Sequence, residues 1–275
     1  MYKLLATDLD GTLFSSDGGV SEGNRRAILD AVERGVHFVL CSGRAPYEGV
    51  SALGKSLGLD RPGNYYICCS GALIVEADTL RPAAGNFLPK ETAAELIRIG
   101  EGFFAEMGVA SIRMHTTRRV YVRNPEAWDA NYSKSRTALT FTPLPADVRE
   151  AEGEITKLLF LSLEEGYAMR FYDRMEKVLP AGALGYRMPP CLAEYVAAEA
   201  NKGRAVAQLA GLLGISAEET VRVGDGWNDI SMLSGAGFGI AVQNAPEEVA
   251  RCADLILDKT NDEDAVAAVL ERYFS

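Results

Sequence analysis

Short, almost wholly apolar segments alternate with helix-like segments at the start of the chain, and this alternation limits the possible folds more than any other feature. Residues 3–7, 36–40 and 65–69 are apolar runs of strand length, and the helix-like segments 21–34 and 46–57 separate them. Near-continuous apolar strands with helices between them are typical of a parallel sheet that is covered on both faces. We therefore predict an α/β fold with a doubly wound, Rossmann-like, mainly parallel sheet.

The end of the chain repeats this pattern. A helix-like segment at 202–213 precedes short apolar runs at 221–223, 239–242 and 255–257, and the chain closes on a helix-like segment at 263–273. Because both ends have the same style, we predict that they contribute strands and helices to one core domain.

The middle of the chain differs from both ends. It contains an amphipathic helix-like segment at 90–104 and two segments, 111–114 and 120–122, whose alternation is typical of antiparallel strands. We predict a discontinuous core domain at 1–85 and 191–275, and an inserted α+β domain at 86–190.

Composition excludes several kinds of partner. Asp and Glu total 38 against 28 Lys and Arg, which gives a net charge of -10. A surface of this sign does not attract nucleic acid or an anionic membrane, although a few local cations could still hold a small phosphorylated ligand. No uncharged run approaches the ~18 residues of a membrane span, and Asp8 and Asp10 interrupt the first apolar run. The five cysteines form no CxxC pair. We expect a cytoplasmic protein, either a monomer or a small homo-oligomer.

Two carboxylates follow the first apolar run, in the segment Asp8-Leu9-Asp10-Gly11-Thr12-Leu13. Two like charges about 4 Å apart repel each other by roughly 4 kcal/mol at an effective dielectric near 20. Either the two side chains diverge into water, as in an ordinary Asp-Gly turn, or a cation holds them.

A second acidic segment, Gly224-Asp225-Gly226-Trp227-Asn228-Asp229, directly follows another apolar strand. The carboxyl ends of parallel strands share one edge of the sheet, where ligands bind. We therefore expect Asp8, Asp10, Asp225 and Asp229 to meet there. Four such acids repel one another unless a hard divalent metal with oxygen ligands holds them, and Mg²⁺ fits this description best.

Two further segments carry groups that could contact an anion, one after a predicted strand and one at the start of a predicted helix. Cys41-Ser42-Gly43-Arg44 follows the second strand, and it offers a hydroxyl and a backbone N–H beside a permissive glycine. Lys202 opens a helix, where a cation is unfavourable to the helix dipole unless it neutralises a bound anion. Taken singly, the segment Cys41–Arg44 is an ordinary loop and Lys202 is an ordinary exposed residue.

These four segments, in this order, resemble the motifs of the haloacid dehalogenase superfamily, and in particular its Cof-type branch of phosphatases with a large α+β cap. The likeness extends to Cys69-Ser70-Gly71-Ala72, to Asn244-Ala245 and to Ala253-Asp254, so it covers both flanks of the chain. The resemblance implies a Mg²⁺-dependent phosphatase that hydrolyses small phosphomonoesters, sugar phosphates above all, and it makes residues 86–190 the cap domain that sets specificity.

The resemblance also assigns roles to residues. Asp8 is implied as the nucleophile that forms an aspartyl-phosphate, and Asp10 as the acid that protonates the leaving alcohol and then helps water attack. Asp8, the Asp10 carbonyl and Asp225 are implied as Mg²⁺ ligands, with Asp229 supporting the metal through its waters. Ser42 and Lys202 are implied to hold phosphoryl oxygens; Leu9, Gly43, Arg44 and Asn228 complete the implied phosphate and substrate site.

The chain departs from the family pattern at Ser70, where the family usually has Asn, and at Trp227, which is bulkier than expected. No departure removes a catalytic group.

Two other functions fit the same residues: a phosphomutase, which would pass the phosphoryl group to a second sugar hydroxyl, and a sensor that binds a phosphorylated ligand without turnover. His115, Arg118 and Arg119 are expected at the tip of a hairpin in the inserted domain.

Overall fold

The computed structural model describes residues 1–127, 141–188 and 191–274. The chain forms two compact units, which we call the core unit (Met1–Gly85 with Asn201–Ser275) and the inserted unit (Asn86–Ala200). The chain thus returns to the core unit after Ala200 and not at residue 191. The reason is that the strand β11 (Leu192–Ala197) pairs with two strands of the inserted unit.

The core unit is built on one sheet whose strand order is β14-β13-β12-β1-β2-β3-β4-β5. The first six of these strands are parallel to one another, whereas β4 pairs antiparallel with β3, and β5 pairs antiparallel with β4. Their bounds are β1 (Leu4–Thr7), β2 (His37–Cys41), β3 (Tyr65–Cys68), β4 (Leu73–Glu76), β5 (Pro82–Gly85), β12 (Thr220–Gly224), β13 (Phe238–Ala241) and β14 (Leu255–Ile256). The predicted mainly parallel sheet is confirmed; the β4–β5 hairpin is an addition to it.

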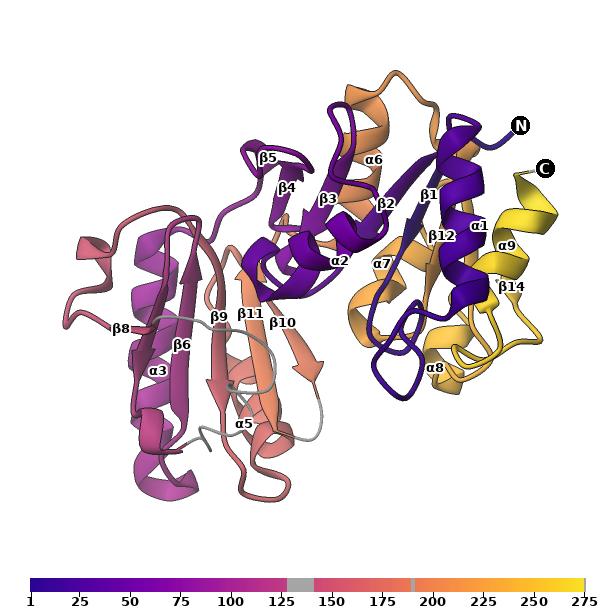
Figure 1. Ribbon diagram of the computed structural model, residues 1–275. Helices are drawn as coiled ribbons and strands as arrows, with labels where there is room; N and C mark the ends of the chain where they lie inside the picture. Colours follow the sequence, from indigo (N-terminus) through magenta and orange to yellow (C-terminus); the bar gives the residue numbers. More distant parts are fainter. Residues whose placement is uncertain (128–140, 189–190, 275) are drawn as a thin grey trace. The chain divides into compact units, whose positions relative to one another are not determined.

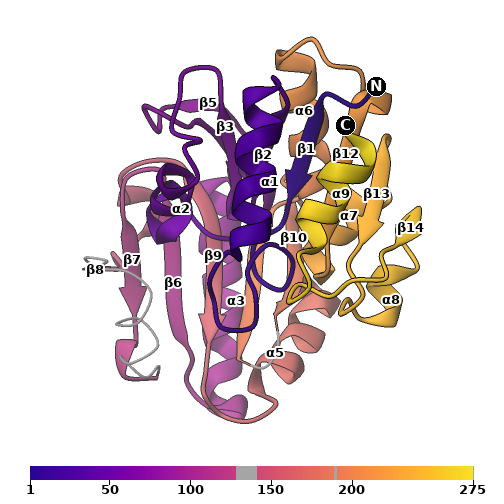
Figure 2. The same cartoon turned by 45° about the vertical axis from the view of Figure 1, so that its right-hand side comes forward.

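Helices cover both faces of this sheet (Figure 1). On one face, Leu4 and Ala6 of β1 pack with Leu209 of α6 and Met232 of α7 in a single apolar cluster. On the other face, α1 lies beside α9 (Figure 2), and the Ala267 N–H donates to the Asn24 side chain at 2.8 Å. The bounds of the helices are α1 (Glu22–Glu33), α2 (Ser51–Ser56) after the helical turn η1 (Pro46–Val50), α6 (Lys202–Leu212), α7 (Ile230–Leu233), α8 (Glu247–Ala250) and α9 (Ala265–Tyr273). The core is therefore doubly wound, as expected.

The inserted unit has its own sheet, of strand order β10-β11-β9-β6-β7-β8, in which only β7 and β8 pair in parallel among the described strands. Apolar residues such as Ile112, Leu158 and Phe160 face the helices, where they pack with Leu96 and Phe171. The bounds are α3 (Lys90–Met107), β6 (Ser111–Thr116), β7 (Val120–Arg123), β8 (Phe141–Pro143), β9 (Ile155–Leu161), α5 (Tyr167–Met175), β10 (Ala183–Met188) and β11 as given above. The predicted α+β character of the insertion is confirmed.

Neither unit offers a membrane-spanning segment within the described ranges. The longest helix of the inserted unit, α3, carries charged residues such as Glu91, Arg98 and Glu106 along its length. No described helix combines the length and the apolar character that crossing a bilayer requires.

Candidate active site

Three loops meet at one edge of the core sheet because β1, β2 and β12 run in the same direction. Asp8 directly follows β1, Ser42 follows β2 and Asp225 follows β12. The hydrogen bonds between neighbouring strands continue one residue beyond β1 and β2. The Asp8 N–H donates to the Val223 carbonyl and the Ser42 N–H donates to the Ile67 carbonyl, each at 2.9 Å. The carboxylate of Asp8 is therefore fixed to rigid backbone.

Lys202 enters the same place from the first residue of α6. Its side chain is fully buried, and its ammonium Nζ donates to Asp8 Oδ1 and, at 2.6 Å, to Asp229 Oδ1. Burial by itself would lower the pKa of Lys202, but the two carboxylates outweigh it and raise the pKa well above its ordinary value. Lys202 is thus a permanent cation that joins two of the predicted acids.

The carboxylates of Asp8, Asp225 and Asp229 form a close group. Each offers an oxygen atom that lies within 4.8 Å of the others. Burial raises the pKa of Asp8 well above its ordinary value, although Lys202 opposes the shift. Burial also raises the pKa of Asp225 to about 6, against the opposing hydrogen bond that Thr12 Oγ1 donates to it at 2.6 Å. When all three acids are ionised, one ammonium among three carboxylates leaves negative charge uncompensated.

This donor set fits a hard divalent cation, since all three groups present oxygen atoms. The backbone at Gly11 passes so close that a Cβ there would lie 2.4 Å from Asp225 Oδ2. Both oxygen atoms of Asp229 already accept hydrogen bonds, because Oδ1 accepts from Lys202 and Oδ2 accepts from the Asp225 and Gly226 N–H groups at 3.0 and 2.8 Å. Asp8 and Asp225 are therefore better placed to bind a metal directly, and Asp229 to support it.

The carboxylate of Asp10 lies apart from this group. Its side chain is 49% exposed and forms an ion pair with Arg44. Arg44 Nε donates to Asp10 Oδ2 at 2.8 Å, and Nη2 donates to Oδ1. The guanidinium carbon also lies 5.3 Å from the centre of the Phe14 ring. The predicted proton donor and a predicted phosphate-binding side chain thus hold each other.

The loop after β2 is tied to two other loops. Ser42 is buried, its Oγ accepts from the Arg44 N–H at 3.2 Å, and its carbonyl accepts from the Ser70 N–H at 3.1 Å. Asn228 Nδ2 donates to Ser70 Oγ at 3.4 Å, and a Cβ on Gly43 would lie 3.2 Å from the same oxygen. Ser70, which departs from the family pattern, therefore connects the loop that carries Ser42 with the loop that carries Asn228.

Backbone strain is concentrated in that connecting loop. Cys69 and Ser70 both have positive φ angles, 53° and 54°, although neither is glycine. Gly71 then passes so close to the start of α6 that a Cβ there would lie 2.3 Å from the Asn201 carbonyl oxygen. Strained backbone of this kind persists only where its surroundings hold it, and it is common at functional sites. Composition and periodicity carry no signal for it.

The remaining residues singled out by the sequence lie in both units. In the core unit, Leu9 is a buried apolar side chain, so only its backbone can take part in the site. Trp227 is 38% exposed beside Asn228. In the inserted unit, His115 is buried within β6 and does not lie at a hairpin tip, whereas Arg119 lies at the turn and pairs with Glu152 at 2.6 Å.

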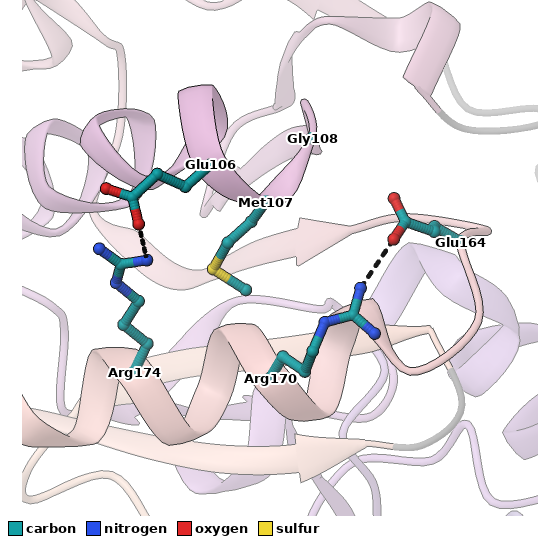
Figure 3. A pocket seen from close by; sticks show the side chains of 6 residues that line it. All are labelled: Glu106, Met107, Gly108, Glu164, Arg170 and Arg174. Carbon is teal, nitrogen blue, oxygen red and sulfur yellow. Dashed lines mark hydrogen bonds and ion pairs between the residues drawn. The ribbon is translucent and has the colours of Figure 1, made fainter.

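A separate cavity of about 560 Å³ lies in the inserted unit, between the end of α3 and α5. Figure 3 shows that its charged side chains already pair with one another: Glu106 with Arg174 at 2.6 Å and Glu164 with Arg170 at 2.7 Å, with Met107 between them. Because the two arginines are already neutralised, this cavity is a poor phosphate site. The acidic group of the core unit remains the candidate active site.

Comparisons with known proteins agree with this geometry. A family model described as haloacid dehalogenase-like hydrolase matches residues 5–270. The phosphatase YwpJ of Bacillus subtilis (strain 168) is 30% identical over 98% of this chain and 99% of its own. In the same organism, the 5-amino-6-(5-phospho-D-ribitylamino)uracil phosphatase YwtE is 27% identical over 99% and 98%. A solved haloacid dehalogenase-like hydrolase from Bacteroides thetaiotaomicron superposes with a TM-score of 0.81, at 28% identity over 99% of both chains.

Proposed function

This chain is a phosphatase of the haloacid dehalogenase-like hydrolase family, and we propose that it hydrolyses small phosphomonoesters in a Mg²⁺-dependent reaction that passes through an aspartyl-phosphate on Asp8. The observation that carries the proposal is the cluster of side chains at the end of β1, where Lys202 donates to Asp8 and the carboxylates of Asp225 and Asp229 lie close by. The core unit is assigned to catalysis and the inserted unit to the choice of substrate.

Asp8 has the properties of a nucleophile in this arrangement. Its backbone is fixed in the sheet and its Oδ1 is held by Lys202, while no described residue donates a hydrogen bond to its Oδ2. In the first step, Oδ2 forms a bond to phosphorus, the ester bond breaks and the leaving oxygen takes a proton from Asp10. In the second step, water attacks phosphorus, gives its proton to Asp10 and releases inorganic phosphate from Asp8.

The other residues act on the phosphoryl group's charge. Lys202 and the Ser42 hydroxyl are proposed to hold its oxygen atoms as charge develops, with Gly43, Arg44, Asn228 and the backbone of Leu9 nearby. The Ser42 N–H, which the sequence also offered for this role, instead donates to the Ile67 carbonyl at 2.9 Å. Mg²⁺, when bound by Asp8, the Asp10 carbonyl and Asp225, would neutralise negative charge so that a carboxylate can approach a phosphate dianion. Asp229 orients Lys202 and supports the metal site.

A phosphorylated sugar or sugar-like alcohol is the proposed substrate class. Support comes from the relative YwtE, whose name describes a phosphatase of a phosphorylated ribityl compound. The test is an assay of inorganic phosphate release from a panel of sugar, sugar-alcohol and cofactor phosphates in Mg²⁺. Release of free phosphate from polyol or sugar esters supports the proposal; transfer to a second sugar hydroxyl would indicate a mutase, and absence of release from every ester would overturn it.

A further inference from the structure

The ion pair between Arg44 and Asp10 connects two of the loops that build the site. Asp10 comes from the loop after β1 and Arg44 from the loop after β2, and the guanidinium engages both carboxylate oxygens of Asp10. Bidentate pairs of this geometry are stronger and more directional than single contacts. The Phe14 ring, 5.3 Å from the guanidinium carbon, further fixes the position of Arg44.

This pair stands in the way of the proposed chemistry. An oxygen atom of Asp10 has to reach the ester oxygen that leaves, but each of the two oxygen atoms accepts a hydrogen bond from Arg44, and together these bonds fix the direction in which the carboxylate faces. The pair must therefore open, or at least rotate, during every catalytic cycle. Half of the Asp10 side chain is exposed and only about a fifth of that of Arg44, so the carboxylate is the member with room to move into solvent-accessible space.

The substrate brings the group that can open the pair. A phosphoryl group on its way to Asp8 carries oxygen atoms in the bidentate arrangement that a guanidinium prefers. Burial alone would lower the pKa of Arg44, yet the hydrogen bond with Asp10 and the negative charges of Asp10, Glu48 and Asp8 raise it. The Arg44 N–H also donates to Ser42 Oγ at 3.2 Å, so the backbone of Arg44 is already fixed beside Ser42, which is proposed to hold the phosphoryl group.

We propose that Arg44 is a substrate-responsive clasp: it holds the Asp10 carboxylate in the substrate-free enzyme and exchanges Asp10 for the phosphoryl group when substrate binds, which releases Asp10 toward the leaving oxygen. Arg44 is then a positioning residue for Asp10 as well as a phosphate ligand. This role of Arg44 depends on the proposed function.

A double-mutant cycle on phosphate binding tests the exchange directly. The affinity for inorganic phosphate in Mg²⁺ is measured by titration calorimetry for the wild type, Asp10→Asn, Arg44→Met and the double variant. Asp10→Asn removes the competitor for Arg44, so it tightens phosphate binding in the wild-type background more than in the Arg44→Met background. From the strength of a half-exposed pair we expect a coupling of about fivefold. Equal effects of Asp10→Asn in the two backgrounds would overturn the clasp. They would mean that removal of the negative charge of Asp10 favours the binding of phosphate whether or not Arg44 is present.

Steady-state kinetics separate the clasp from a fixed structural contact. Loss of a charged hydrogen bond to phosphate weakens binding by roughly tenfold to a hundredfold, so Arg44→Met raises KM by that factor and lowers kcat less. Arg44→Lys keeps the charge without the bidentate fork and gives an intermediate KM. If Arg44 only braces Asp10, kcat falls while KM and the phosphate affinity stay unchanged, which would contradict the proposal.

Arg119 supplies a matched control in the inserted unit. Arg119→Met breaks an arginine–carboxylate pair, with Glu152 at 2.6 Å, and leaves KM unchanged within about twofold, as expected for an exposed pair. If the wild type releases phosphate from an ester but the double-mutant cycle shows no coupling, the clasp is rejected and the proposed function stands. No release from any ester rejects the proposed function, whatever the cycle shows.

Discussion

The buried ammonium of Lys202 donates a hydrogen bond to the carboxylate of Asp8, although 194 positions of sequence separate the two residues. Asp8 directly follows β1 and Lys202 is the first residue of α6, so the contact ties the two segments of the core unit to each other at the candidate active site. The same ammonium holds Asp229, so Lys202 offsets the repulsion between two buried acids.

Replacement of Lys202 should destabilise the protein strongly. Lys202→Met leaves Asp8 and Asp229 buried without their cation, and removal of one partner from a buried pair reduces the free energy of unfolding by about 3 kcal/mol or more. Urea denaturation in excess chelator measures the change. Lys3→Met is the matched control, because Lys3 pairs with Glu219 at 2.6 Å at the surface and should lose less than about 1 kcal/mol. Similar losses in the two variants would argue against the role given to Lys202.

Asp225 should make the metal-free protein less stable as the pH rises. Its pKa is raised to about 6 in the fold, so the folded state binds more protons than the unfolded state between the ordinary pKa of about 4 and that value. The favourable contribution is present in acid and is lost as the pH rises through about 6. With screening by solvent, the loss amounts to about 1–2 kcal/mol.

The measurement for Asp225 is a pH series of thermal unfolding in chelator. Asp225→Asn removes the titration, so its stability should fall less with rising pH than that of the wild type, and added Mg²⁺ should stabilise it less. Asp60→Asn, at an exposed position outside the site, serves as the control and should follow the wild type. A wild-type curve parallel to that of Asp225→Asn would refute the assignment.

Gly11 and Gly18 offer a matched pair of substitutions. Both have φ near +85° to +88°, but a Cβ on Gly11 would lie 2.4 Å from Asp225 Oδ2, whereas a Cβ on Gly18 would meet nothing within 4 Å. Both alanine variants should lose about 1 kcal/mol of stability through backbone strain. Only Gly11→Ala should also displace Asp225, which predicts that the metal concentration for half-maximal activity rises by about tenfold or more. Equal Mg²⁺ dependence in both variants would show that the Gly11 contact does not shape the metal site.

The sheet edge was predictable from the sequence because strand direction determines it. Asp8, Ser42 and Asp225 each follow an apolar run, and parallel strands necessarily bring their carboxyl ends together. The position of Lys202 in the first turn of a helix is by itself equally typical of an exposed lysine, and only the family resemblance placed Lys202 in the site. The contact between Arg44 and Asp10 was not, because the motif fixes where each backbone lies but not which neighbour a long side chain selects.

The placement of His115 shows a second limit. The alternation at 111–114 predicts an antiparallel strand with His115 beyond it, at the hairpin tip. In the structure β6 extends to Thr116, and its polar residues Arg113 and His115 are buried together with its apolar ones. Periodicity identifies the two faces of a strand, but it carries no information about what covers the polar one. The return to the core unit was placed too early for a related reason, since β11 is held in the inserted unit by pairing with β9 and not by local composition.

Arg222 provides a prediction outside the catalytic machinery. It is 1% exposed, and its Nε and Nη2 atoms have no hydrogen-bond partner among the described residues. Burial lowers the pKa of Arg222, because the charged guanidinium is less stable away from water. Arg222→Met keeps most of the volume and removes the charge, so the free energy of unfolding should rise by about 1–2 kcal/mol. A clear loss of stability in urea denaturation would mean that the guanidinium is held by interactions stronger than its cost of burial.

Trapping the phosphoenzyme tests directly whether the side chain of Asp8 is the nucleophile. Enzyme quenched in acid during turnover is treated with borohydride, which reduces an aspartyl-phosphate to homoserine, and the modified residue is located by mass spectrometry of the peptides. We expect homoserine at position 8 only, in the wild type with substrate and Mg²⁺, and neither this modification nor phosphate release in Asp8→Asn. Full phosphate release by Asp8→Asn, or homoserine at another aspartate, would contradict the proposed reaction.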